Sequence, residues 1–257
     1  MTTAALWHGP SFPLGPTSTY EISLATTLDD VRACQHLRYE VFNAELGEGL
    51  ESSHSLGLDR DSFDVICDHL LVREAGTGEA VGTYRVQTGY RALGNAGYYS
   101  QEFFDFAPYE GIRGELLELG RACVHRDHRD SGVLLLLWKG IFRYAKQTGT
   151  RYLIGCSSVT SQDAAEGLAL YRDLQKKYLA PLEFRTVPRP GHTLPTAKTA
   201  ETYRRAPRLL RAYLELSAKI CGPPAIDREF KTIDFLTLLD LDEIPVTLRR
   251  RLSGNQG

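Results

Sequence analysis

The spacing of apolar and polar residues predicts a chain that alternates between helices and strands. After Thr27, apolar residues recur at helical spacing and predict a helix over 28–43. The segment at 27–30, Thr-Leu-Asp-Asp, resembles a capping box and marks the start of that helix. Residues 69–74 and 80–87 have the pattern of two strands, and the glycine-rich turn between them predicts a hairpin.

The same pattern continues toward the C-terminus. We expect strands at 115–124, 151–159, 181–187 and 230–239, helices at 132–147, 163–178 and 206–220, and one helical turn at 100–106. This order predicts an α/β fold with a mixed β-sheet flanked by helices. We also expect a loose tail at 1–19, a core at 20–200, and a C-terminal helical extension at 201–257 that packs on the core.

Composition excludes several classes of protein. Of 257 residues, 42% are hydrophobic and 24% are charged, and the net charge of −2 argues against a dedicated nucleic-acid binder. The five cysteines are odd in number and form no CxxC pair, which favours reduced thiols in a cytoplasmic protein. No stretch approaches the roughly 18 apolar residues that span a bilayer. His125 and His128 lack a third ligand at metal spacing, so we expect no metal.

The segment from Glu115 to Ala145 carries the first motif. It reads Glu-Leu-Leu-Glu-Leu-Gly-Arg-Ala-Cys-Val-His-Arg-Asp-His-Arg-Asp-Ser-Gly and continues into a leucine-rich helix. This resembles the core of the GNAT superfamily, in which a turn and a helix N-terminus receive the pyrophosphate of the acyl carrier. Helix N-termini offer unpaired N–H groups, Arg126 and Arg129 would add charge-assisted bonds, and Gly132 allows close backbone approach.

This loop departs from the usual acetyl-CoA version, because the second glycine of its Gly-x-Gly or Gly-x-Ala turn is missing. The departure weakens the case for acetyl-CoA. The resemblance therefore implies a donor in the form of acyl carrier protein, whose phosphopantetheine arm ends in a phosphodiester, and no permanently bound cofactor.

A second set of motifs is spread along the chain. In order these are Arg38-Tyr39-Glu40-Val41-Phe42, Asp61-Ser62-Phe63-Asp64, Gly82-Thr83-Tyr84-Arg85, Phe103-Phe104 and Glu118-Leu119-Gly120-Arg121. Their order and spacing are similar to those of the acyl-homoserine lactone synthases and their relatives, the ornithine N-acyltransferases and long-chain N-acyl amino acid synthases. These GNAT-fold enzymes take acyl chains from acyl carrier protein.

A third set, near the C-terminus, resembles the ornithine acyltransferase branch, which is also called hemolysin-like. It consists of Pro207-Arg208-Leu209-Leu210, Tyr213, Gly222-Pro223-Pro224-Ala225-Ile226-Asp227, Glu229-Phe230 and Asp234-Phe235-Leu236. The homoserine lactone synthases do not share this extension. The resemblance covers about residues 20–245 and implies ornithine as the acceptor.

Amide formation from a thioester needs a neutral amine, a positioned carbonyl and a stabilised oxyanion. We expect Glu118 to accept the amine proton, directly or through water, with Arg121 beside it. The alternative is that Glu118 holds Arg121 or Arg85 in an ion pair. The resemblance implies that an N–H near 122–124 meets the oxyanion, and that Asp61 and Asp64 line the amine site.

Arg38, Arg85 and Arg121 are expected to form a buried cluster with these acids, either for substrate binding or as a purely structural network. Phe42 and Phe104 are candidates for lining an acyl tunnel, although apolar residues are more often plain core. Cys123, an apolar-strand thiol, is expected to be inert rather than a nucleophile.

These expectations combine into an N-acyltransferase that joins a long acyl chain, with or without a 3-hydroxyl, from acyl carrier protein to ornithine. The alternatives are another acceptor such as glycine, tyrosine or glutamine, a homoserine lactone synthase, and a non-catalytic carrier- or lipid-binding module. Helix 206–220, with arginines at 204, 205, 208 and 211 and Lys219, could contact the inner membrane, or form an ordinary packed helix with a solvated basic face.

Overall fold

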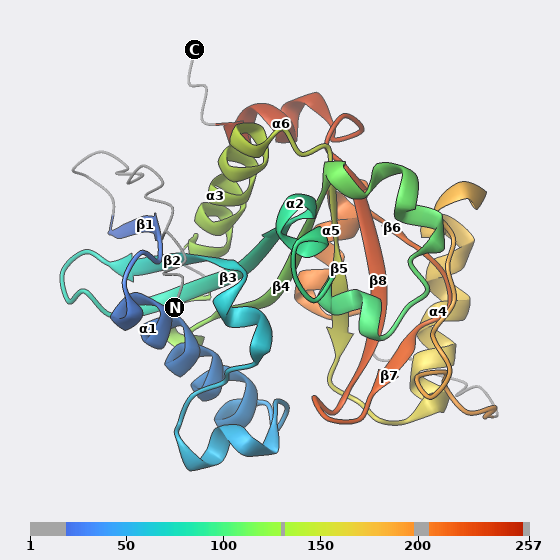
Figure 1. Cartoon of the computed structure of the whole chain (residues 1–257), viewed down its shortest axis with the longest axis horizontal. Coiled ribbons are helices and arrows are strands. Elements are labelled where there is room, and N and C mark those ends of the chain that lie inside the picture. Colours follow the sequence, from blue (N-terminus) through green and yellow to red (C-terminus); the bar gives the residue numbers. More distant parts are fainter. Residues whose placement is uncertain (1–18, 130–131, 198–205, 254–257) are drawn as a thin grey trace. The chain divides into compact units, whose positions relative to one another are not determined.

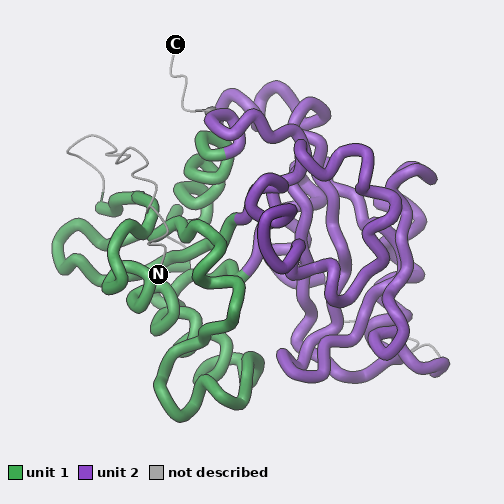
Figure 2. Tube along the Cα trace, viewed as in Figure 1, with its two compact units in different colours: residues 1–86, 121–144 green, residues 87–120, 145–257 purple. Residues whose placement is uncertain are grey.

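The computed structural model describes residues 19–129, 132–197 and 206–253. These residues build a mixed sheet of eight strands with helices around it, as the sequence predicts (Figure 1). The chain divides into two compact units (Figure 2). Unit 1 holds the residues up to 86 and 121–144, and unit 2 holds 87–120 and the residues from 145 onward.

Unit 1 contains an antiparallel part of the sheet. Strand β1 (Tyr20–Leu24) pairs with β2 (Asp68–Glu74), which pairs with β3 (Ala80–Thr88) as the predicted hairpin. The next strand in sheet order is β4 (Leu116–Val124), whose last four residues belong to this unit. Most of helix α3 (Val133–Thr148) also lies here and packs closely on the sheet, because a Cβ at Gly140 would come within 2.5 Å of Ile22.

The polar segments of unit 1 position the charged residues. Helix α1 (Leu28–Arg38) begins at the predicted capping box of Thr27 and runs directly into a π-helix, η1 (Tyr39–Glu45). Two 3₁₀ helices, η2 (Glu51–Ser55) and η3 (Ser62–Val65), follow before β2. The predicted helix at 28–43 is therefore present, but its last part, from Tyr39 onward, has π geometry, which is frequent at functional sites.

Unit 2 is built around two long strands. In it, β4 pairs in parallel with β5 (Tyr152–Val159), and β5 pairs along its whole length with antiparallel β8 (Thr232–Asp240). Strands β6 (Lys219–Ile220) and β7 (Ala225–Asp227) also pair with β8. The remaining elements are α2 (Gly89–Leu93), α4 (Ala164–Tyr178), α5 (Arg208–Glu215), α6 (Val246–Ser253), η4 (Tyr99–Glu102), η5 (Ala107–Glu115) and η7 (Leu182–Phe184).

Two hydrophobic cores cover opposite faces of β8, because successive side chains of a strand alternate between faces. Leu236 and Leu238 pack among the aromatic residues that follow α2, whereas Ile233 and Phe235 pack against α4 and α5. The apolar side of α5 is thus part of a core, as expected for an ordinary packed helix.

Two predicted elements are wrong in detail. Residues 181–187 are not a strand, because the N–H of Phe184 binds the Pro181 carbonyl and forms η7. The helix expected at 206–220 ends at Glu215, because Ser217 adopts φ +80° and the following residues turn into β6. The predicted extension contains α5 and α6, and it also supplies β6, β7 and β8 to the sheet.

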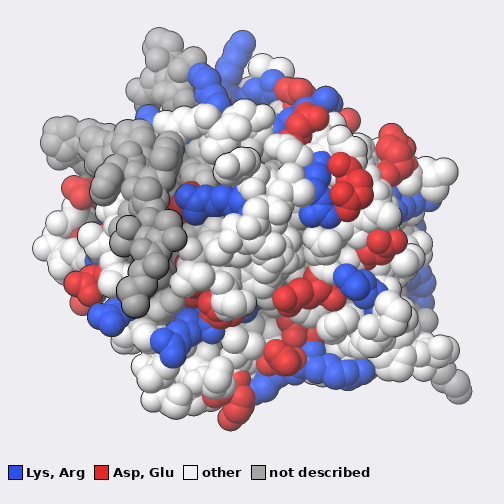
Figure 3. Space-filling view, in the orientation of Figure 1, with Lys and Arg blue, Asp and Glu red and all other residues white. Residues whose placement is uncertain are grey.

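The predicted tail at 1–18 and the arginines at 204 and 205 lie outside the described residues. Within the described ranges, no helix is both long and apolar enough to cross a bilayer. Basic and acidic side chains are interspersed over the face drawn in Figure 3, in keeping with the small net charge of −2.

Candidate active site

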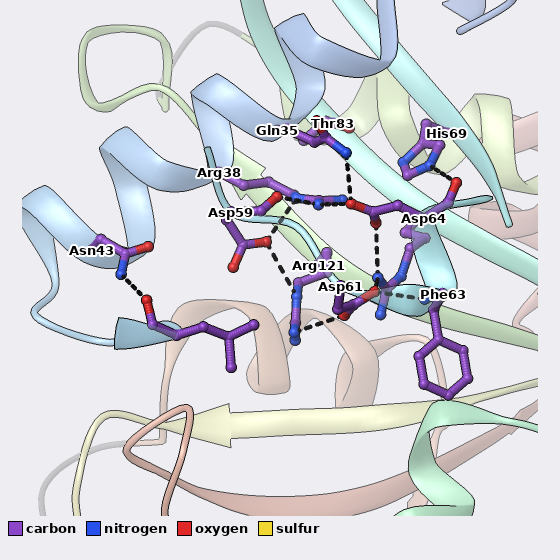
Figure 4. A network of polar contacts seen from close by, with 12 residues as sticks. Gln35, Arg38, Asn43, Asp59, Asp61, Phe63, Asp64, His69, Thr83 and Arg121 are labelled. Atoms are coloured by element: carbon purple, nitrogen blue, oxygen red, sulfur yellow. Dashed lines mark hydrogen bonds and ion pairs between the residues drawn. The ribbon is translucent and has the colours of Figure 1, made fainter. Parts of the chain in front are cut away.

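Three arginines and three aspartates form a buried network in unit 1 (Figure 4). The arginines come from three different elements, with Arg38 at the end of α1, Arg85 on β3 and Arg121 on β4. The aspartates all come from the loop before η3 and from η3 itself; they are Asp59, Asp61 and Asp64. Sequence reasoning placed five of these six residues together and missed Asp59.

The contacts of the network are short and shared. Arg38 lies 2.9 Å from Asp59 and 2.6 Å from Asp64, and it also donates to the Asp59 carbonyl. Arg85 bridges Asp61 at 2.5 Å and Asp64 at 2.9 Å. Arg121 bridges Asp61 at 3.0 Å and Asp59 at 3.3 Å. Each acid therefore contacts two arginines, and three positive charges balance three negative ones.

Burial and charge act against each other on the aspartates. Burial raises the pKa of Asp61, but Arg85 and Arg121 outweigh it and hold that pKa below its usual value. Burial likewise raises the pKa of Asp64, and Arg38 and Arg85 bring it far below its usual range. Asp61 and Asp64 are therefore carboxylates at neutral pH. Asp61 is the more accessible, with a side chain 14% exposed against 3% for Asp64.

Neutral side chains complete the network. The Gln35 amide donates to Asp64 over 2.9 Å, and His69 Nε2 lies 3.1 Å from the Asp64 carbonyl. Burial, followed by the positive charge of Arg38, lowers the pKa of His69 to about 4. His69 is therefore neutral at physiological pH, and its imidazole serves as a buried polar contact.

Arg121 has an unusual backbone conformation for a strand residue, with φ +50°. Left-handed conformations cost a non-glycine residue roughly 1 kcal/mol, so surrounding contacts must hold Arg121 in place. Asp59 and Asp61 supply such contacts through the guanidinium. This left-handed residue lies three positions after Glu118, which is the last residue of β4 that pairs in register with β5.

Glu118 lies three residues before Arg121 on the same strand, in the part of β4 that belongs to unit 2. Its side chain is buried, and its two oxygens accept the backbone N–H groups of Tyr99 at 2.8 Å and Ser100 at 2.7 Å. These groups begin η4, whose first N–H groups have no partner within the helix. The carboxylate is thereby fixed in position; its role as a base stays a prediction.

The loop after β4 carries the residues predicted to bind the donor's phosphate. Arg126 is exposed in η6 (Arg126–His128), and Gly132 adopts φ +88° immediately before α3. Arg129 makes a two-pronged ion pair with Glu45, at 2.6 and 2.8 Å, and also donates to the Val124 carbonyl. Glu45, the last residue of η1, has no counterpart in the sequence-based hypothesis.

Phe42 and Phe104, the candidates for an acyl tunnel, are both buried. Phe42 lies on η1, and Phe104 follows η4 and packs among Tyr98 and Phe106.

All five cysteines are free, and burial raises the pKa of Cys123 well above its usual value. A thiol of this kind is a poor nucleophile. Among the described residues, no cluster of three or more His, Cys, Asp and Glu is arranged to hold a metal.

Two kinds of similarity to known proteins agree with this geometry. Residues 37–139 match an acetyltransferase (GNAT) domain, and this range contains almost every residue described above. The chain is 34% identical to an L-ornithine N(alpha)-acyltransferase from Rhodobacter capsulatus, over 86% of this chain and 90% of that protein. A second L-ornithine N(alpha)-acyltransferase, from Brucella abortus, is 31% identical over 92% of this chain and 90% of its own length.

Solved structures share the fold. The AHL synthase LasI superimposes with a TM-score of 0.52 at 12% identity, over 92% of this chain and 95% of LasI. At these full-length identities above 30%, and with the GNAT domain matched, this chain is an acyltransferase and belongs to the family of the L-ornithine N(alpha)-acyltransferases.

Proposed function

We propose that this protein transfers a long-chain fatty acyl group, with or without a 3-hydroxyl, from acyl carrier protein to the α-amine of ornithine. The product would be a lyso-ornithine lipid. The observation that carries this proposal is the full-length similarity to the relative from Rhodobacter capsulatus, which is named L-ornithine N(alpha)-acyltransferase. The buried charges on and around β4 supply a physical basis for the chemistry.

In the proposed reaction, the ornithine α-amine attacks the thioester carbonyl carbon and forms a tetrahedral oxyanion. The amine proton moves to Glu118, directly or through one water. Collapse of the intermediate breaks the C–S bond, and the proton then passes to the departing phosphopantetheine thiolate. Glu118 suits this role because two backbone N–H groups fix both of its oxygens. An N–H of β4 between 122 and 124 stabilises the oxyanion.

The network of unit 1 suits a zwitterionic acceptor. Ornithine carries one carboxylate and two amines, so its recognition requires charges of both signs. Asp61 is the least buried of the three aspartates, and we assign to it the contact with an ammonium group of the acceptor. We assign to Arg121 the contact with the acceptor carboxylate, while Arg38 and Arg85 hold the aspartates in place.

On the donor side, Arg126, Arg129 and Gly132 bind the phosphodiester of the phosphopantetheine arm, and Phe42 and Phe104 line the path of the acyl chain. The protein would act in the cytoplasm, with peripheral contact at the inner membrane, because a long-chain acyl product is itself amphiphilic and partitions there.

The test is mass spectrometry of the products that purified protein makes from palmitoyl carrier protein or palmitoyl-CoA and a mixture of amino acids that includes ornithine. N-palmitoyl-ornithine formed with the carrier protein supports the proposal. The same product from palmitoyl-CoA alone would show that the proposed donor is wrong. A different N-acyl amino acid would show that the proposed acceptor is wrong. No product with either donor would favour a non-catalytic binding module.

A further inference from the structure

The ion pair between Glu45 and Arg129 lies on the loop that is assigned to the donor's phosphate. Each carboxylate oxygen of Glu45 meets a different terminal nitrogen of Arg129, at 2.6 and 2.8 Å. This two-pronged geometry is the one in which a guanidinium also binds two oxygens of a phosphate. Glu45 thus occupies the donor atoms of Arg129 that a phosphate would use.

The surroundings of Glu45 are basic. The bond to Arg129 is the main cause that lowers the pKa of Glu45, and charges on Arg126 and His125 act in the same direction. All three basic groups belong to the segment between β4 and α3. The carboxylate of Glu45 therefore neutralises the part of the chain on which phosphate binding depends.

The pair is also accessible to a ligand. The side chains of Arg129 and Glu45 are 36% and 25% exposed, in contrast to the almost fully buried pairs of the arginine–aspartate network. Partly exposed ion pairs contribute little net stability, because water competes with each partner. Replacing the Glu45 carboxylate at Arg129 by the anionic group of a ligand therefore costs little free energy.

We propose that Glu45 occupies Arg129 in place of the donor's phosphate, and that donor binding exchanges one anion for the other. This inference rests on the proposed function, since it takes Arg129 as a phosphate-binding residue. Glu45 then sets donor affinity by competing for Arg129. Its release also frees the last residue of η1, the π-helix that carries Phe42 and follows Arg38.

The test is calorimetric binding of palmitoyl carrier protein and of palmitoyl-CoA to the full chain, without amine. Glu45→Gln keeps the shape of the side chain and removes its charge, so we expect donor Kd to fall about tenfold. Arg129→Gln should raise Kd about tenfold or more. Adding Glu45→Gln to Arg129→Gln should then change nothing further, because the competition needs Arg129.

Glu40→Gln is the matched control. Glu40 lies on the same π-helix, and its half-exposed carboxylate lies 3.8 Å from His36 on the preceding turn. We expect this variant to bind both donors like the unchanged protein. Equal tightening by Glu40→Gln and Glu45→Gln would overturn the exchange in favour of general charge repulsion.

Two other outcomes are also decisive. If the unchanged protein binds and transfers the acyl group but Glu45→Gln binds donor no better, the exchange is wrong while the proposed function stands. If Glu45→Gln tightens binding equally in the Arg129→Gln background, Arg129 is not the shared partner and the exchange is also wrong. Failure of the unchanged protein to bind either donor would overturn both proposals.

Discussion

The molecule holds buried carboxylates in two different ways. In unit 1, Asp59, Asp61 and Asp64 are each met by two guanidinium groups, so that full charges cancel. In unit 2, both oxygens of Glu118 are met by the uncharged backbone N–H groups of Tyr99 and Ser100. The first arrangement makes a rigid framework, whereas the second positions a carboxylate through two backbone donors. We therefore expect loss of Arg38, which holds the aspartates in place, to appear mainly in stability, and loss of the Glu118 carboxylate mainly in turnover.

The largest expected effect on stability comes from Arg38→Met. Arg38 is completely buried and bridges Asp59 and Asp64, so its loss leaves three buried carboxylates facing only two guanidinium groups, with one negative charge in excess. Breaking a buried pair in this way costs about 3–5 kcal/mol of unfolding free energy. Urea unfolding followed by circular dichroism measures the change.

The matched control is Arg32→Met on the same helix. Arg32 pairs with Asp29 at the surface, where the two side chains are 69% and 90% exposed. Its removal should change the free energy of unfolding by less than about 0.5 kcal/mol. If both variants lost the same amount of unfolding free energy, the buried network would not be a framework that stabilises the fold.

A smaller effect concerns acid stability and His69. The pKa of His69 is about 4 in the folded chain, below its ordinary 6.5, so the unfolded chain binds a proton that the folded chain does not. Stability from this residue is present above pH 6.5 and is lost as the pH falls from 6.5 to 4, by up to about 3 kcal/mol. Asp61 and Asp64, whose pKa values are lowered, lose their contribution only below pH 4.

His69→Gln should therefore flatten the pH dependence of unfolding between pH 6.5 and 4 and leave the loss below pH 4 in place. Urea titrations at pH 6.5, 5.5 and 4.5 measure the slope. A variant with the same slope as the unchanged protein would show that another group causes the acid sensitivity of this window.

The smallest expected effect is that of Cys123→Ala. The Cys123 thiol is buried on β4, and burial raises its pKa, so we expect direct acyl transfer without a cysteine intermediate. Turnover should stay within about threefold of the unchanged protein, apart from any loss of folded protein. Accumulation of an acyl-cysteine at residue 123, seen by mass spectrometry after acid quench, would contradict direct transfer.

Much of the fold could be predicted because its long elements have strong periodic patterns. The hairpin of β2 and β3, the apolar helix α3, and strands β5 and β8 all appear at or near their expected positions. Short elements such as β1, β6 and β7 could not be predicted, because two to five residues carry too little periodicity. The prediction of a strand at 181–187 was wrong, because apolar residues that alternate with polar ones also occur in a 3₁₀ turn that packs on a core.

The residues of the candidate site could likewise be predicted only in part from the sequence. The family resemblance, in which such acids pair with arginines, pointed to a cluster of Asp61 and Asp64 with Arg38, Arg85 and Arg121, and the structure contains that cluster. Asp59 belongs to the same acidic loop, two residues before Asp61, and that closeness was the available signal. Glu45 could not be found, because its partner Arg129 is 84 residues away in the sequence.

The most direct test of the central claim is single-turnover acyl transfer to ornithine by Glu118→Gln, beside Glu115→Gln as the control. Glu115 is an exposed acid that immediately precedes β4, so its loss should leave transfer unchanged. Loss of a general base predicts a rate of N-acyl-ornithine formation about 10²–10⁴-fold lower for Glu118→Gln, in a protein that remains folded. Transfer by folded Glu118→Gln at a rate within tenfold of the unchanged protein would contradict the account.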